Sequence, residues 1–310
     1  MADVAIRTEG WRTLPWKDYQ RNVYRLQQRI YRAARRDDWQ RVHKLQRLLL
    51  RSWSARCLAV RQVTQDNRGK RTPGVDGIAS LTPEERLRYA HQLRYLSRWT
   101  TDPIRRTYIP KSSNPNELRG LGIPTLRDRA MQAVVKLTLE PEWEAQFEPN
   151  SYGFRPGRSI HDAIEAIFNH IRLKPKFVLD ADIEKCFDRI DRKALLAKLH
   201  APQAVMRLIR DWLDEGVLDH GQWLYPEAGT PQGGVISPLL ANIALHGLET
   251  AVSTCTRKHP VVIIRYADDL VILCDDLDTL KVAQAIAAEW LATMGLQFKS
   301  SKTHITHTLD

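Results

Sequence analysis

The sequence has few cysteines, and it lacks any long apolar run. The four cysteines show no C-x-x-C or zinc-knuckle spacing, so they predict reduced thiols in a cytoplasmic chain rather than a zinc site. No apolar stretch is long enough to span a bilayer, and the first residues, MADVAIRTEGW, lack the apolar segment of a signal peptide. No G-x-x-x-x-G-K-[ST] loop is present. We therefore expect a soluble globular protein without a membrane partner.

Acidic residues are scarce at the N-terminus. Residues 1–72 contain 18 Lys and Arg against 6 Asp and Glu, a net charge of +12, whereas the whole chain carries +11. The surplus positive charge therefore belongs to this segment. Such a patch binds polyanions by releasing counterions, so it predicts a nucleic acid partner. The alternative is a solvated helix surface with surplus arginine.

Residues 16–60 have the helical spacing of apolar side chains. Val23 to Ala34 and Val42 to Trp53 predict two amphipathic helices, with an Asp after Arg36 capping the second. Cations on the polar faces, and in the Gly- and Pro-rich loop that follows, suit phosphate contacts that do not read bases. These predicted RNA-binding residues are Arg25, Arg29, Arg32, Arg36, Lys44, Arg47, Arg68, Lys70 and Arg71.

The stretch VVIIRYADDLVILC, Val261 to Cys274, predicts a buried hairpin. Its apolar runs read as short strands, and Asp268 and Asp269 occupy the expected turn. Two carboxylates at the tip of a buried hairpin repel each other, and burying them is costly without a counter-cation. A divalent cation that prefers oxygen ligands is the natural partner.

A second acidic segment, FVLDADIEKCFD, runs from Phe177 to Asp188. Asp180 and Asp182 are two residues apart, so they face the same side of an extended strand. One of them is expected to cap or form a salt bridge, while the other meets Asp268 and Asp269 across the sheet. Such a three-carboxylate cluster is typical of sites that hold two magnesium ions for phosphoryl transfer.

Two further segments carry weaker signals. Residues 104–129 predict a β-hairpin with a polar turn at Ser112 to Asn116, followed by a helix from Ala130 to Phe147. Cations on and after this ribbon suit a triphosphate or a template backbone, although plain surface is the alternative. They are Lys111, Arg119, Arg127 and Arg129.

The segment Gly229 to Pro238, GTPQGGVISP, precedes an apolar run from Leu239 to Leu248 that we expect to be helical. Glycines before a helix allow close approach of a ligand, and an ordinary loop is the alternative.

The motifs SYGFRPGRS, DADIEKCFD, GTPQGGVISP, YADD and GLQFKSSKT, in this order, resemble the reverse transcriptases encoded by group II introns. The resemblance extends back through RTPGVDG and YIPK…LRGLGIPTLRDR, and it covers nearly the whole chain. It implies an α+β right-hand polymerase fold, with an antiparallel ferredoxin-like sheet in the palm. The expected parts are a helical N-terminal extension (1–75), fingers (76–170) and palm (171–310), without a thumb.

The resemblance also implies roles for single residues. Asp182, Asp268 and Asp269 are the expected catalytic and metal-binding aspartates, joined by the Ile183 carbonyl, while Asp180 is a structural partner. The expected nucleotide-binding residues are Lys111, Arg119, Phe187, Gln232 and Lys302. Phe187 would close off the 2′ side of the sugar, and Lys302 would lie near the departing pyrophosphate. Cys186 departs from the family pattern, in which a second aromatic residue is usual here.

The function implied by the resemblance is RNA-directed DNA polymerisation, with two Mg²⁺ ions and Mn²⁺ as a substitute. The expected partners are intron RNA, an RNA or DNA template with its primer, and deoxynucleotides. Intron RNA binding would support splicing (the maturase role) and retrohoming, and a second copy of the chain is a further candidate partner.

Alternatives are an RNA-binding maturase module without polymerase activity, or a retron or CRISPR-associated reverse transcriptase. The G-G-[DE]-E-F and G-D-D hairpins of nucleotide cyclases and viral RNA polymerases are absent.

Overall fold

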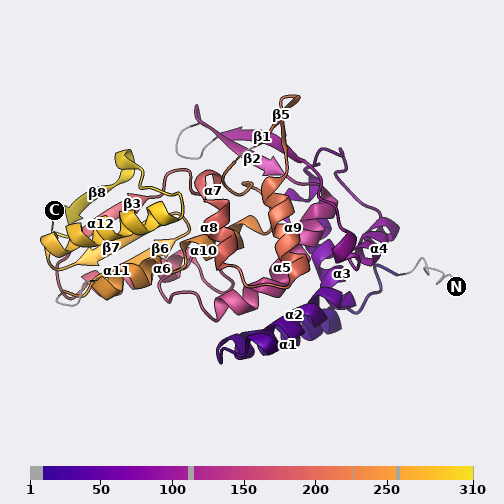
Figure 1. Ribbon diagram of the computed structural model, residues 1–310, viewed down its shortest axis with the longest axis horizontal. Helices are drawn as coiled ribbons and strands as arrows, with labels where there is room; N and C mark the ends of the chain where they lie inside the picture. Colours follow the sequence, from indigo (N-terminus) through magenta and orange to yellow (C-terminus); the bar gives the residue numbers. More distant parts are fainter. Residues whose placement is uncertain (1–9, 111–114, 226, 256–258, 310) are drawn as a thin grey trace. The chain divides into compact units, whose positions relative to one another are not determined.

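The structure is a computed structural model that describes residues 10–110, 115–225, 227–255 and 259–309. The chain forms two compact units (Figure 1). The first comprises Met1–Gln146, His200–Glu227 and Pro231–Ser237, and the second comprises Phe147–Leu199, Ala228–Thr230 and Pro238–Asp310.

Helices dominate the first unit. They are α1 (Trp16–Ala34), α2 (Trp39–Arg51), α3 (Trp53–Arg61), α4 (Pro83–Gln92), α5 (Leu126–Glu144) and α9 (Gln203–Asp214), with the π-helical turn η1 (Gln62–Asp66) and the 3₁₀ turns η2 (Arg68–Arg71) and η3 (Leu96–Arg98). Asp38 caps α2 by accepting a hydrogen bond from the Arg41 backbone N–H, as predicted. The second predicted helix was too long, because Ser52 leaves the helical conformation and caps α3 instead.

The apolar faces of these helices form a core. Val23, Ile30, Val42 and Leu49 are buried in it, together with Ala33, Ala34, Leu45 and Ala55. Leu137 of α5 packs against this cluster. The apolar spacing of residues 16–60 therefore predicted the buried faces correctly.

Helix α5 extends beyond its predicted limits at the N-terminal side. It begins at Leu126 rather than Ala130, because the Thr125 hydroxyl accepts a hydrogen bond from the Asp128 N–H. Pro141 lies inside the helix, where it cannot donate to the Leu137 carbonyl. The Gln27 side chain of α1 donates to that carbonyl instead, at 3.0 Å. A contact between helices thus satisfies the acceptor that proline leaves open.

A four-stranded sheet completes the first unit. Its strands are β1 (Ile104–Pro110), β2 (Leu118–Ile123), β4 (Val217–Asp219) and β5 (Gln222–Leu224), in the order β2-β1-β4-β5. Strands β1 and β2 form the predicted antiparallel ribbon, and β1 pairs with β4 in parallel. The predicted turn of the β1–β2 ribbon, Ser112 to Asn116, lies mostly within residues 111–114, which are outside the described residues.

The second unit contains an antiparallel sheet and its helices. The strands are β3 (Phe177–Asp182), β6 (Val262–Tyr266), β7 (Asp269–Cys274) and β8 (His304–His307), in the order β6-β7-β3-β8. The helices are α6 (Ile160–Ile171), α7 (Cys186–Arg189), α8 (Arg192–Lys198), α10 (Ser237–Leu245), α11 (Leu248–Cys255) and α12 (Leu277–Thr293), with the 3₁₀ turn η4 (Ser300–Lys302).

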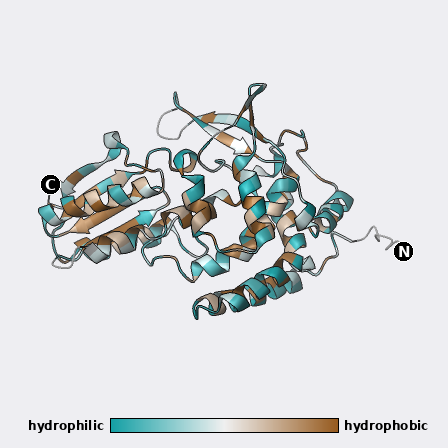
Figure 2. Ribbon diagram, in the orientation of Figure 1, coloured by the Kyte–Doolittle hydropathy of each residue, from teal (hydrophilic) through white to brown (hydrophobic). Residues whose placement is uncertain are grey.

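Both faces of this sheet are covered. On one face, Ala163 of α6 packs with Ile264 and Leu273. The alternate positions, such as Leu179 and Ile272, are fully buried on the other face, and α12 contacts β3 and β7. Figure 2 shows these strands mainly in the hydrophobic colour. Strands buried on both faces explain the near-continuous apolar runs in the sequence.

Two predicted boundaries in this unit were wrong. The hairpin turn consists of Ala267 and Asp268, because Asp269 already pairs with Tyr266 as the first residue of β7. The predicted helix from Leu239 to Leu248 is split into α10 and α11, because Gly247 has φ +104°, which a helix does not tolerate.

The predicted α+β class, with an antiparallel sheet in the second unit, is confirmed. Within the described residues, each helix is too short or too polar to cross a lipid bilayer.

Candidate active site

The two acidic segments meet at one end of the sheet in the second unit. Asp182, the last residue of β3, pairs with Asp269, the first residue of β7. Asp268 lies in the turn before it, and its carbonyl accepts a hydrogen bond from the Ile183 N–H at 3.0 Å. Ile183 is fully buried. The fold therefore places Asp182 across the sheet from the turn that carries Asp268 and the start of β7 at Asp269, so the two acidic segments are neighbours.

The electrostatics of this cluster reflect crowded negative charge. Partial burial raises the pKa of Asp269, and the nearby Asp268 and Asp182 carboxylates raise it further. The Lys302 ammonium opposes this effect and donates to Asp182 Oδ2 at 2.6 Å. The pKa of Lys302 is raised by the same hydrogen bond. A positive charge next to these carboxylates thus relieves their repulsion.

Asp180 lies near this cluster, and its charge also raises the pKa of Asp269. It is on the same face of β3 as Asp182, but it is exposed, and its carboxylate is 3.8 Å from His304 Nε2. The same-face expectation for the two residues is therefore met, and Asp180 pairs with a neighbouring strand.

Arg265 supports the turn that carries Asp268. This buried guanidinium donates to the Ala267 carbonyl (3.0 Å), the Asn242 side chain (3.0 Å) and the Ser151 hydroxyl (2.6 Å). Burial lowers the pKa of Arg265 to about 10. Arg265 was not among the residues predicted from the sequence. The available signal was a charged side chain in an otherwise apolar strand, which is costly unless it is fully hydrogen-bonded.

The segment SYGF lies against the same turn. The Tyr152 N–H donates to the Arg265 carbonyl at 2.9 Å. A Cβ atom on Gly153 would lie 2.3 Å from the Ala267 backbone nitrogen, so only glycine fits. The loop predicted from its Gly and Pro content is therefore a close backbone support of the aspartate turn.

Phe187 lies on α7, directly after β3. Its ring contacts Phe154 edge-to-face, with centroids 6.0 Å apart, and its carbonyl accepts a hydrogen bond from the Thr230 N–H. Gly229 has φ +84°, and a Cβ there would lie 2.5 Å from the Asp188 carbonyl. The first two residues of GTPQGG thus pack against the backbone that carries Phe187. Cys186, the first residue of this helix, is buried, and burial raises the pKa of its thiol to about 12.

The other predicted nucleotide-binding residues belong to the first unit. Arg119 is exposed on β2 opposite Ile109, and Lys111 lies outside the described residues. The Gln232 carbonyl accepts a hydrogen bond from the Gly122 N–H at 2.5 Å. Gly233 has φ +116°, and a Cβ there would lie 2.6 Å from the Gly122 oxygen. GTPQGG is thus anchored to the end of β2.

Two predicted phosphate-binding cations have structural contacts instead. Arg129 is buried and donates to the carbonyls of Gly69 and Thr72. Arg127 stacks over the Trp99 ring at 4.3 Å and donates to the Thr100 carbonyl. The sequence could not distinguish these arginines from surface cations, because their partners are backbone carbonyls in distant segments.

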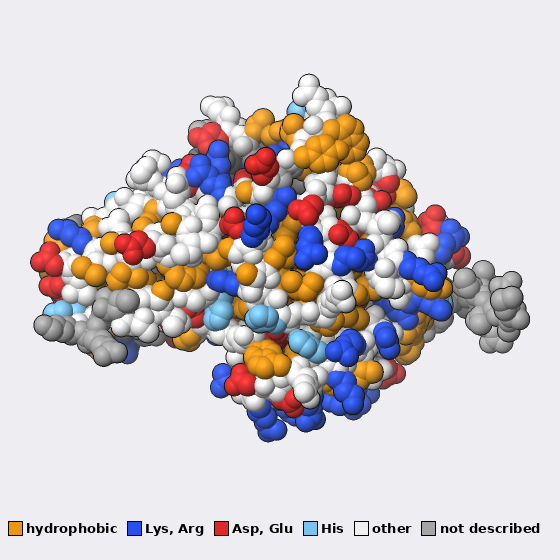
Figure 3. Space-filling model, in the orientation of Figure 1, with side chains coloured by type: hydrophobic (Ala, Val, Ile, Leu, Met, Phe, Trp, Pro, Cys, Tyr) orange, Lys and Arg blue, Asp and Glu red, His pale blue; other side chains and the backbone are white. Residues whose placement is uncertain are grey.

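The predicted RNA-binding cations of the N-terminal helices are exposed. Figure 3 shows Lys and Arg side chains gathered over α1 and α2. The exposed members of the predicted set are Arg25, Arg29, Arg32, Arg36, Lys44, Arg47 and Arg71. Lys70 is half-buried and donates to the Gln65 carbonyl at 2.7 Å. The side chain of Arg68 lies outside the described part of the structure.

The donor set at the aspartate cluster suits a hard divalent cation, because it consists of carboxylate and carbonyl oxygens. The raised pKa of Asp269 shows that its charged form is destabilised, and a bound cation would stabilise that form. Among the described residues, however, no three His, Cys, Asp or Glu side chains converge on one metal position, and Lys302 contacts Asp182. The oxygen donors are thus of the type that Mg²⁺ prefers, but in the described part of this structure Asp182 is paired with Lys302 and the carboxylates do not surround one metal position.

Two family models match the chain. One, described as reverse transcriptase (RNA-dependent DNA polymerase), matches residues 109–309, and the other, the N-terminal domain of reverse transcriptase, matches residues 11–93.

The chain is similar to protein YkfC of Escherichia coli, with 31% identity over 93% of this chain and 86% of that protein. It is also similar to the group II intron-encoded protein LtrA of Lactococcus lactis, with 39% identity over 59% of this chain but 31% of that protein. Maturase-like protein 1 of Euglena gracilis is 29% identical over 93% of this chain and 60% of that protein.

The fold resembles a solved structure of apo telomerase from Candida tropicalis. The TM-score is 0.52 at 14% identity, covering 67% of this chain and 51% of that one, so the likeness concerns the fold alone. The aspartate cluster, the ordered motifs and the two family matches all point to the same family. The chain belongs to the reverse transcriptase family of RNA-dependent DNA polymerases, with group II intron-encoded proteins and maturases among its relatives.

Proposed function

We propose that this chain is the catalytic portion of an RNA-directed DNA polymerase of the group II intron type. The observation that carries the proposal is the pairing of Asp182 with Asp269, with Asp268 in the adjoining turn. Within this proposal, residues 1–75 act as a basic extension, residues 76–170 as fingers and residues 171–310 as palm.

Asp182 and Asp268 are the proposed direct ligands of magnesium, with Asp269 and the Ile183 carbonyl as further oxygen donors. Two Mg²⁺ ions, replaceable by Mn²⁺, would lower the pKa of a primer 3′-hydroxyl and neutralise charge on the phosphates. The contribution of the protein is to hold these oxygens on a rigid sheet end. Arg265 and Gly153 support that end through the Ala267 backbone.

The proposed nucleotide contacts are Lys111, Arg119, Phe187, Gln232 and Lys302. Guanidinium and ammonium groups suit triphosphate oxygens. Phe187 is rigidly placed by its contact with Phe154 and by the Thr230 hydrogen bond, as a residue that excludes a 2′-hydroxyl must be. The substrates in this proposal are deoxynucleotides on a primed RNA or DNA template.

The exposed cations of α1 and α2 support binding of intron RNA, and through it a role in splicing and retrohoming. The same observation favours a second candidate, an RNA-binding maturase module in which the polymerase site is idle. A retron or CRISPR-associated reverse transcriptase is a further alternative. Self-association of the chain is also proposed.

Primer extension tests the proposal. The assay uses an RNA template, deoxynucleotides and Mg²⁺, and it compares the chain with Asp268→Asn and with Asp180→Asn, a matched control on the same strand. A version that carries a C-terminal helical thumb is tested in parallel. We expect incorporation that Asp268→Asn abolishes and Asp180→Asn retains. Tight RNA binding without incorporation in either version would reject the polymerase and leave the maturase module.

A further inference from the structure

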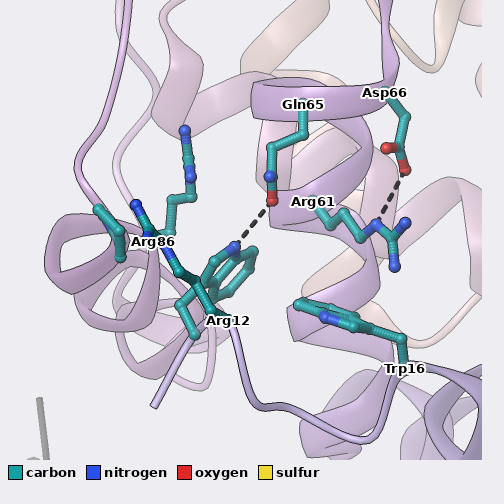
Figure 4. A pocket seen from close by; sticks show the side chains of 8 residues that line it. Arg12, Trp16, Arg61, Gln65, Asp66 and Arg86 are labelled. Carbon is teal, nitrogen blue, oxygen red and sulfur yellow. Dashed lines mark hydrogen bonds and ion pairs between the residues drawn. The ribbon is translucent and has the colours of Figure 1, made fainter. Parts of the chain in front are cut away.

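A cavity of about 510 Å³ lies in the first unit (Figure 4). Small-molecule sites commonly have volumes of roughly 300–1,000 Å³. None of the predicted catalytic, nucleotide-binding or RNA-binding residues lines it. The lining residues are Trp11, Arg12, Trp16, Arg61, Gln65, Asp66, Pro83 and Arg86.

Three separate stretches of the chain, residues 11–16, 61–66 and 83–86, build the cavity. Trp11 and Arg12 precede α1, Arg61 ends α3, and Arg86 lies on α4. Gln65 belongs to the π-helical turn η1, and such turns are rare and frequent at functional sites. The Trp11 indole N–H donates to Gln65 Oε1 at 2.7 Å, which fixes this wall. Figure 4 shows Arg12 and Arg86 on one side and Arg61 with Trp16 on the other.

The charge of the lining is unbalanced. Three guanidinium groups face one carboxylate, that of Asp66, which lies 3.4 Å from Arg61 Nε. The Arg86 Nε atom is buried and has no hydrogen-bond partner among the described residues. Burial lowers the pKa of Arg86, and the charge of Arg12 lowers it further. The nearby Glu85 carboxylate is engaged in capping α4 through the Thr82 N–H.

We propose that this cavity binds the phosphomonoester of a nucleotide, either at the 5′ end of an RNA or on a free nucleoside monophosphate. Such a group carries a charge of about −1.5 to −2 at pH 7, which balances the lining, whereas a phosphodiester carries only one charge. Arginine forks match phosphate oxygens, and the guanidinium groups of Arg12, Arg61 and Arg86 line the cavity as candidate donors.

A nucleotide fits better than a phosphopeptide. The indole of Trp16 is half-buried at the cavity, with the Arg61 guanidinium 4.8 Å from its ring centroid and the Trp11 ring 5.0 Å away, so groups that can contact a base are gathered here. The surrounding N-terminal segment carries a net charge of +12, which attracts a polyanion. This inference does not depend on polymerase activity, because the cavity shares no residue with the aspartate cluster.

Competition binding tests the inference. Fluorescence anisotropy of one RNA oligonucleotide, with a 3′ label and either a 5′-phosphate or a 5′-hydroxyl, is measured with the whole chain. Unlabelled 5′-phosphorylated RNA, AMP, inorganic phosphate and a phosphoserine peptide serve as competitors. We expect the 5′-phosphate to strengthen binding about tenfold, the effect of a charge-assisted hydrogen bond. Arg86→Gln should remove this preference. The matched control is Arg88→Gln, an exposed arginine on the same helix.

Equal affinity for the two RNAs would overturn the proposal, and so would a preference that Arg86→Gln leaves intact. A phosphoserine peptide that competes better than AMP would reject the nucleotide assignment. Competition by AMP as strong as by the phosphorylated RNA supports a free nucleotide, and stronger competition by the RNA supports an RNA end. If Arg86→Gln does not fold, Arg12→Gln, at an exposed position before α1, gives the same test. Asp268→Asn should retain the preference, which separates this result from any failure of polymerase activity.

Discussion

At the residue scale, the contact between Lys302 and Asp182 has a direct consequence for cation binding. The ammonium lies 2.6 Å from a carboxylate that is a proposed magnesium ligand. A cation that binds Asp182 must therefore compete with a positive charge already present. Because the Lys302 side chain is 56% exposed, solvent screens this ion pair, and its effect should be modest.

We predict that Lys302→Met tightens Mn²⁺ binding about threefold, because it removes a screened positive charge from the aspartate cluster. Calorimetric titration with Mn²⁺ measures the change. Lys281→Met, at an exposed position on α12, is the control and should bind Mn²⁺ like the unaltered chain. Unchanged or weaker binding in Lys302→Met would contradict the prediction. Unchanged single-turnover incorporation would also remove Lys302 from the proposed pyrophosphate contacts.

Most residues of the candidate site could be predicted from the sequence, but the residues that hold them in place could not. Asp182, Asp268 and Asp269 stand out because paired carboxylates in apolar strands are costly without a special role. Arg265 looks like an isolated charge until Asn242 and Ser151, from distant segments, complete its hydrogen bonds. Sequence spacing carries no information about such partners.

At the element scale, α2 and α5 share a buried polar contact. The Gln46 side chain donates to Glu142 Oε2 at 2.5 Å, and both residues are buried within the helical core. Burial raises the pKa of Glu142 to about 7 from 4.5. Between these two values only the folded state keeps the proton, so the free energy of unfolding decreases as pH rises through this window.

Because of Glu142, we expect the free energy of unfolding to decrease by about 3 kcal/mol between pH 4.5 and pH 7. Glu142→Gln keeps an acceptor for Gln46 but cannot ionise, so this contribution to the pH dependence should disappear. Urea unfolding at several pH values in this range measures both proteins. Identical pH dependence of the two free energies of unfolding would show that Glu142 does not titrate in the folded state as described.

Helix α5 also illustrates how far element boundaries were predictable. The helix predicted from Ala130 to Phe147 already included Pro141, but its start at Leu126, with Thr125 as the cap, was not predicted. Proline is tolerated here because Gln27 of α1 satisfies the Leu137 carbonyl. Local propensity favours ending a helix before proline, and a tertiary contact overrides that preference.

At the scale of the whole molecule, positive charge is concentrated at one end of the sequence. Residues 1–72 carry a net +12, and the rest of the chain is close to neutral. If these cations contact RNA phosphates, affinity must fall steeply with salt, because each contact releases counterions.

We predict that the triple variant Arg25→Gln, Arg29→Gln and Arg32→Gln reduces the slope of log affinity against log salt by about 2 for single-stranded RNA. Filter binding over a salt series measures this slope. The control is Lys193→Gln with Lys281→Gln, which removes exposed charge outside the N-terminal segment. A slope that changes equally in the control, or not at all in the triple variant, would locate RNA binding elsewhere.

The sequence by itself determined the family, the α+β class, the buried faces of the N-terminal helices and the identity of the paired aspartates. These follow from local periodicity and from ordered motifs, which residues carry regardless of their neighbours. Only the tertiary structure decided that Lys302 pairs with Asp182, that Arg265 holds the aspartate turn, and that Arg12, Arg61 and Arg86 surround one cavity. Each of these depends on hydrogen bonds and charges between segments far apart in the chain, and their energies arise only when folding removes water and brings those segments together.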